Sequence, residues 1–177
     1  YIAGQTLEML DHNITHEYHC ELILGSLDQI RDRVKSNTAP PSLPSWKFDH
    51  DRQGWRFNNA SDTGWPLKDV WHVLLEKDDP QLFSPHVFFD AGEAPVLTIR
   101  AAFKTRHQNG TVFWRRLENG RSVEGGALNF PIQGDGVMRD HIVRLSDSKN
   151  YHGKILEFRI DPVPSGADGD WVKVESV

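Results

Sequence analysis

The chain has 177 residues, a net charge of −5 and 38% hydrophobic residues. A chain of this length buries roughly two-thirds of the surface that it exposes when unfolded, so it needs neither a metal nor a disulfide to fold. Its acidic and basic residues are mixed along the sequence, which argues against a nucleic-acid-binding module, where basic residues cluster. No run of apolar residues reaches the ~18 that a transmembrane helix needs.

Residues 3–36 show the periodicity of amphipathic helices. Apolar side chains recur there at spacings of three, four and five residues, at Leu7, Leu10, Ile14, Tyr18, Leu22, Leu27, Ile30 and Val34. One or two such helices cannot bury their own apolar face, so they must pack on the rest of the chain or on another domain. Because the sequence also begins at Tyr1, we interpret residues 1–36 as a helical leader at the end of an upstream domain.

Residues 37–45 predict a linker. Three of the five positions 40–44 are proline, which disfavours both helix and sheet hydrogen bonding and favours an extended chain. We therefore place a domain boundary there and expect a separate domain at 46–177.

From residue 46 onward the hydrophobic period changes to two, which is typical of β-strands. In 97–104 the residues Leu97, Ile99, Ala101 and Phe103 alternate with the other positions and are expected to face a core. Asn109-Gly110 predicts a hairpin turn, and Asn119-Gly120 closes a strand at 111–117. Further strands are expected at 68–75, 84–90, 139–145, 154–160 and 170–176. Many short strands separated by turn residues predict an all-β antiparallel sandwich.

Five segments, in order, resemble a known family. They are WKFD at 46–49 followed by GW at 54–55; DPQLFSP at 79–85 with FDA at 89–91; VLTIR at 96–100 with VFW at 112–114, taken as paired central strands; GKI at 153–155 with FRIDP at 158–162; and WVKVE at 171–175. Together they resemble the galactose-binding-like jelly rolls that serve as carbohydrate-binding modules of bacterial polysaccharide hydrolases, lyases and sulfatases. Tyr151-His152 stands where that pattern has a tryptophan.

The resemblance implies a jelly-roll β-sandwich, preceded here by one or two α-helices, that binds a polysaccharide. It also implies a covalently linked catalytic domain and an extracellular or periplasmic location. Such domains often hold a structural calcium ion between their first and last strands, where Asp49 and Glu175 would meet. Calcium prefers oxygen ligands of this type. A surface ion pair is the alternative for these two residues.

Strand order from the resemblance, combined with the alternation, places Arg100, Trp114, His141 and Arg159 on one polar sheet face. Arginine binds carboxylate or sulfate through two parallel hydrogen bonds, so the predicted ligand is a polysaccharide, acidic or sulfated. Alternatively, Trp114 belongs to the core and the arginines pair with Glu157 and Asp161. Trp65 lies in a turn-rich loop, as either a second sugar platform or a cover for the sandwich edge.

The sequence indicates a binding protein more than an enzyme. It carries the adjacent pair Asp78-Asp79 but no nucleophile motif and no evident pair of opposed carboxylates. We therefore expect a non-catalytic accessory module of a larger carbohydrate-active enzyme. The competing hypothesis is a structural domain that braces a catalytic module without binding sugar, and the apolar leader favours it.

Overall fold

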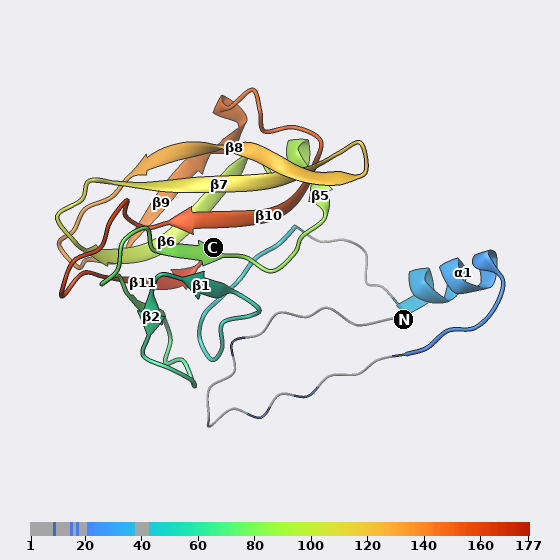
Figure 1. Ribbon diagram of the computed structural model, residues 1–177, viewed down its shortest axis with the longest axis horizontal. Coiled ribbons are helices and arrows are strands. Elements are labelled where there is room, and N and C mark those ends of the chain that lie inside the picture. Colours follow the sequence, from blue (N-terminus) through green and yellow to red (C-terminus); the bar gives the residue numbers. More distant parts are fainter. Residues whose placement is uncertain (1–8, 10–14, 16, 18–20, 38–42) are drawn as a thin grey trace.

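The computed structural model describes residues 9, 15, 17, 21–37 and 43–177 and consists mainly of two antiparallel sheets (Figure 1). One sheet has the order β1 (Arg56–Asn58), β4 (Gln81–Phe83), β10 (Lys154–Asp161), β7 (Asn109–Glu118) and β8 (Arg121–Pro131), and β5 (Phe89–Asp90) also pairs with β10. The other has the order β2 (Ser61–Asp62), β3 (Trp71–Leu74), β11 (Trp171–Ser176), β6 (Val96–Lys104) and β9 (Arg139–Arg144). The predicted all-β jelly-roll sandwich is confirmed.

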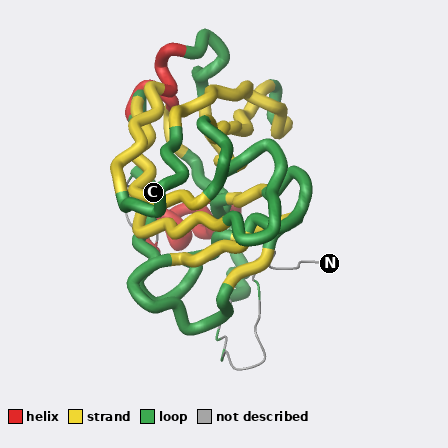
Figure 2. Tube along the Cα trace, turned by 90° about the vertical axis from the view of Figure 1, so that its left-hand side faces the viewer, coloured by secondary structure: helices red, strands yellow, loops and turns green. Residues whose placement is uncertain are grey.

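The chain crosses repeatedly from one sheet to the other, and loops make these crossings at both ends of the sandwich (Figure 2). The prediction of a hairpin at Asn109-Gly110, and of paired strands on either side of it, is wrong because β6 and β7 lie in different sheets. Gly110 lies within β7, where an added Cβ would lie 2.6 Å from the Phe130 ring. Its small size therefore serves packing. Asn119-Gly120 forms a genuine turn, with φ of 50° and 72°, between β7 and β8.

The core lies between the sheets and is rich in aromatic rings. The inward residues of β6 are those expected, with Leu97, Ile99, Ala101 and Phe103 all buried. Trp46, Phe48, Trp55 and Trp71 pack with ring-centroid distances of 5.2 to 6.3 Å. Such pairs add to the stabilisation that burial of the rings already provides.

The two ends of the β-domain lie side by side. The backbone of Trp46 exchanges two hydrogen bonds with Val177, and the Phe48 amide donates to the carbonyl of Glu175.

Tyr151 is buried and packs against Trp114, with ring centroids 5.4 Å apart, and its hydroxyl donates to the carbonyl of Ala94.

The leader contains the helix α1 (Leu27–Asn37), which stands apart from the sheets in Figure 1. Ser26 and Gln29 begin it with reciprocal hydrogen bonds, since each side chain accepts from the other's backbone amide. The prediction of helix across 3–36 is wrong at the described residues before Leu27, which are 9, 15, 17 and 21–26 and have no helical structure. Much of 1–20 and residues 38–42 of the linker lie outside the described residues. No helix in the described part of the chain is long and apolar enough to cross a lipid bilayer.

Two small residues of β8 accommodate the ring of Trp114. An added Cβ at Gly125 would lie 2.1 Å from Cδ1 of Trp114, and the register between β7 and β8 shifts at this point. We expect Gly125→Ala to lower the free energy of unfolding by about 1–3 kcal/mol, because the buried indole must move. Gly92→Ala is the matched control, since nothing lies within 4 Å of its added Cβ. Urea unfolding measures both, and equal stabilities of the two variants would contradict this packing.

Candidate functional site

The outward face of the six-stranded sheet carries a row of stacked aromatic and cationic side chains. Strand register aligns Arg56 with Phe83, Phe83 with Arg159, and Arg159 with Phe113 across β1, β4, β10 and β7. The guanidinium carbon of Arg56 lies 4.5 Å from the centroid of Phe83, and that of Arg159 lies 3.9 Å from the centroid of Phe113. Both distances fit a cation–π contact. We call this set the stacked row.

On β8 the stacked row ends at Ala127, which lies opposite Phe113 and is exposed. The guanidinium of Arg159 comes from β10, on the other side of Phe113. The ring face turned toward β8 therefore has only a methyl group as its cross-strand neighbour. A small exposed side chain therefore neighbours a half-buried aromatic ring on this side.

A second row, of hydrogen-bonding groups, runs beside the stacked row. Asn58 lies opposite Gln81, Asp161 opposite Thr111, and Thr111 opposite Asn129. The Asn58 amide contacts the Gln81 carbonyl oxygen at 3.4 Å, and the Thr111 hydroxyl donates to the Asn129 side chain at 2.9 Å. These amide and hydroxyl groups both donate and accept, as sugar hydroxyls do. We call this set the polar row.

Two bulges shape the other edge of the face. The register of β10 with β7 shifts between Ile155 and Glu157, and that of β7 with β8 shifts after Trp114. As a result Glu157, Arg115 and Glu124 align across three strands beside the stacked row. Bulges re-aim side chains in this way and occur often beside functional sites. The residues that line a small hollow of about 90 Å³ here are Phe83, Phe113, Trp114, Arg115, Glu124, Glu157 and Arg159.

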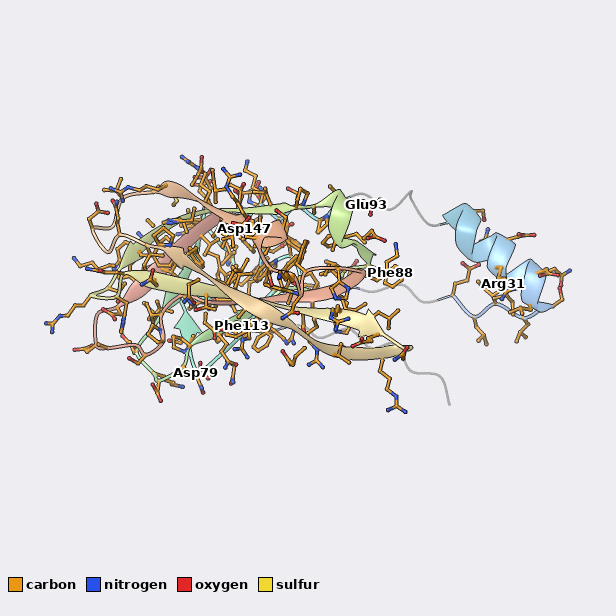
Figure 3. All side chains as sticks on the ribbon, turned by 90° about the horizontal axis from the view of Figure 1, so that it is seen from above. Arg31, Asp79, Phe88, Glu93, Phe113 and Asp147 are labelled. Atoms are coloured by element: carbon orange, nitrogen blue, oxygen red, sulfur yellow. The ribbon has the colours of Figure 1, made fainter. Side chains whose placement is uncertain are left out.

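The charges on this face are paired. The Nη2 of Arg56 lies 2.8 Å from Glu157, the Nε of Arg159 lies 2.9 Å from Asp161, and the Nη1 of Arg115 lies 3.8 Å from Glu124. Burial raises the pKa of Asp161 to about 6, against the opposing effect of Arg159, and the charge of nearby Asp79 raises it further. Phe113 and Asp79 mark this side of the sandwich in Figure 3.

The sequence predicts one polar sheet face formed by Arg100, Trp114, His141 and Arg159. This prediction is wrong, because the four residues belong to two different sheets. Arg159 lies in the stacked row, whereas Arg100 and His141 belong to β6 and β9 in the opposite sheet. Arg100 pairs there with Asp140 and Glu175 at 3.0 and 3.1 Å. The alternative, in which the arginines pair with Glu157 and Asp161, is confirmed for Arg159 with Asp161, whereas Arg100 has other partners and Glu157 pairs with Arg56.

Trp114 and His141 are core residues. Trp114 is 1% exposed and aligns with Phe158, on the face of the sheet opposite to Arg159. His141 aligns with the buried Ile99 and packs against Phe103 and Phe130. Its ring nitrogens contact the carbonyls of Pro131 and Ala101 at 3.0 and 3.3 Å. Neither ring is available to stack on a sugar in this structure.

Trp65 is half-buried in the loop between β2 and β3, which belong to the five-stranded sheet. It therefore does not join the stacked row, and its role as a sugar platform stays a prediction. Next to it, Asp62 forms a buried ion pair with Arg52 at 2.7 Å and accepts from the Trp71 indole at 2.8 Å. Burial would raise the pKa of Asp62, but these hydrogen bonds outweigh it and lower the pKa.

Asp49 and Glu175 lie on neighbouring segments, since the Phe48 amide donates to the Glu175 carbonyl. Their carboxylates face cations, however: Asp49 lies 3.8 Å from the Nζ of Lys47, and Glu175 contacts Arg100. Among the described residues, no three His, Cys, Asp or Glu side chains gather to hold a metal ion. The two carboxylates thus fit the ion-pair alternative better than a calcium site, and calcium binding stays a prediction.

A larger hollow of about 610 Å³ lies between the turns at 105–109 and 131–135. Its lining is about equally polar and apolar, and Asp135, which contributes to it, pairs with Arg139 at 2.6 Å. It combines polar groups with aliphatic side chains but offers no phenylalanine, tyrosine or tryptophan among its described lining residues. The outward face of the six-stranded sheet is therefore the better candidate for ring-shaped ligands.

Sequence reasoning missed Phe83, Phe113 and Arg56. A signal was present, because Thr111, Phe113 and Arg115 alternate with the inward Val112 and Trp114. Placing Trp114 on the binding side inverted that strand. The largest aromatic residue fills the core here, and its smaller neighbour faces outward.

No known protein family matches this chain, and no curated protein matches it. Among solved structures, it is similar to the carbohydrate-binding module CsCBM6-3 from Clostridium stercorarium, solved in complex with cellobiose. The match covers 79% of this chain and 95% of that chain, with 16% sequence identity and a TM-score of 0.40. The sheet order and strand register described above, and not this comparison, define the architecture of the chain.

Asp161 makes the stability of the fold depend on pH. Because its pKa is raised to about 6, the folded state holds the proton more tightly than the unfolded chain does. Its contribution to stability is full below about pH 4, the ordinary carboxyl value, and is lost as pH rises through about 6. We expect the stability of the wild type relative to Asp161→Asn, which cannot titrate there, to fall between pH 4 and pH 7 in thermal unfolding. A difference independent of pH would contradict the shifted pKa.

Trp114→Ala is expected to act on folding. It removes a fully buried indole and should lower the free energy of unfolding by about 3–5 kcal/mol. Trp65→Ala, at a half-buried loop position, should cost clearly less. Chemical denaturation of the two variants tests this, and a Trp114→Ala protein as stable as the wild type would place that ring outside the core.

Proposed function

We propose that this chain is a non-catalytic glycan-binding module and that its binding site is the outward face of the six-stranded sheet. The observation that carries the proposal is the juxtaposition of the stacked row with the polar row, aligned across β10 and β7. Protein sites for sugars need a flat apolar surface for the C–H faces of the ring and nearby groups that donate and accept hydrogen bonds to its hydroxyls. Phe113 beside Ala127 supplies the first, and Thr111 with Asn129 supplies the second.

The two buried carboxylates of β10 favour binding over hydrolysis. Glu157 and Asp161 face the same side but are four residues apart on one strand, which separates their Cα atoms by about 13 Å. In glycosidases the two carboxyls face each other across a cleft that admits the substrate, whereas these two lie side by side on one strand. Glu157 is also held by Arg56 at 2.8 Å. These two groups are therefore better suited to hold a ligand or its neighbours than to cleave a glycosidic bond.

The sequence resemblance to galactose-binding-like jelly rolls supports the wider proposal. In it, the module serves a larger extracellular or periplasmic carbohydrate-active enzyme, to which it is covalently linked. The module would keep that enzyme on its polysaccharide.

A bracing role is the second candidate, favoured by one observation on the leader. Leu22, Leu24 and Leu27 are 71%, 87% and 61% exposed. Apolar side chains gathered on a segment outside the sandwich are typical of contact with another protein surface. A bracing domain would bind no glycan, which separates the two candidates.

Phe113→Ala tests the site directly. We expect it to weaken association with a bound polysaccharide by about tenfold or more, the loss that follows truncation of an aromatic anchor. Ala127→Leu should have a similar effect by filling the space beside the ring. Phe88→Ala is the matched control, because Phe88 is 60% exposed outside the two rows. Affinity electrophoresis through polysaccharide-containing gels measures the change; unaltered binding by both site variants would refute this location.

A further inference from the structure

The charges of the candidate site are already neutralised within the protein. Three guanidinium groups, of Arg56, Arg115 and Arg159, each lie within 4 Å of a carboxylate. With Asp79, whose charge acts on Asp161, the same face carries one more carboxylate than it has arginines. No arginine of the two rows or of the bulged edge is left to meet an incoming anion.

Breaking these pairs to bind an anion would be unfavourable. The side chain of Glu157 is 9% exposed and that of Asp161 is 10% exposed. If a uronate or sulfate took the guanidinium of Arg56 or Arg159, a largely buried carboxylate would lose its partner. The protein would then bear the large desolvation cost of an unpaired buried charge.

A neutral sugar makes no such demand. Hydroxyls donate to carboxylates and accept from guanidinium and amide groups, so they add to an ion pair without replacing either member. The polar row offers both kinds of group at Gln81, Thr111 and Asn129. The free side of Phe113 fits a C–H face, which neutral pyranoses expose.

We propose that the site binds neutral, hydroxyl-rich polysaccharides and discriminates against uronic acid and sulfated chains. The discrimination comes from the paired charges, which leave no arginine without a carboxylate partner among the described residues of the two rows and the bulged edge, and which leave one surplus carboxylate. This inference rests on the proposed function and names the ligand class of the same site. It replaces the acidic or sulfated ligand expected from the arginines alone.

The test compares two groups of probes on the intact chain. The neutral group is cereal β-glucan, xylan and galactomannan; the anionic group is polygalacturonate, alginate and dextran sulfate. We expect association with at least one neutral polysaccharide to be about tenfold or more tighter than with every anionic one at moderate ionic strength. Tighter binding of an anionic polysaccharide at this face would overturn the inference and leave the proposed function standing. Silence toward all six would overturn both.

A charge-release variant tests the mechanism. Glu124 is 75% exposed, so Glu124→Gln should free Arg115 without disturbing the fold. We expect it to strengthen association with dextran sulfate by about threefold or more. Asp140→Asn is the matched control, because it removes one negative charge from an exposed site on the opposite sheet, where Arg100 keeps its pair with Glu175. Equal gains in the two variants would indicate a general charge effect and would overturn the assignment of discrimination to this face.

Discussion

Strand β10 is the element on which both the core and the candidate site depend. Its inward side chains, Phe158 and Ile160, are buried between the sheets, and its outward ones, Arg159 and Asp161, lie at the centre of the candidate face. Hydrogen bonding to β4 on one side and β7 on the other fixes its register. A register shift of one residue would turn the inward side chains outward and the outward side chains inward. Because the core requires the apolar side chains, burial also fixes the alignment of the stacked row.

The bulge after Ile155 shows how this constraint accommodates a site. Strict alternation along β10 would turn Ile155 outward together with Glu157. In the structure Ile155 is fully buried, because the register shift lets the strand change phase before Glu157. The extra residue keeps an apolar side chain in the core and still brings Glu157 to Arg56. One irregularity therefore serves packing and the charge pairing of the face together.

The fold could be predicted from sequence where alternation is unbroken, as in β6, and where a turn has a specific chemistry, as at Asn119-Gly120. Prediction failed at β8, because Gly125 and Gly126 in its middle suggest a loop. Their role emerges only from a long-range contact, the ring of Trp114, which leaves no room for a Cβ. The predicted pairing of β6 and β7 is wrong for the same kind of reason. In the sequence, a glycine that packing requires, such as Gly110, cannot be distinguished from a glycine that a turn requires.

The candidate site was harder to predict, because residue type alone does not tell which face of a strand is outward. Trp114 is a more obvious sugar platform than Phe113. Only every second side chain of the strand faces the core, however, and Trp114 is one of these. The arginines posed a similar problem, since a guanidinium indicates an anion-binding site only if no carboxylate reaches it first. Arg56 and Glu157 are 101 residues apart in sequence and meet only through the sheet order β1-β4-β10. The charge class of a ligand therefore depends on topology, and an accurate register carries more information about binding than the count of arginines does.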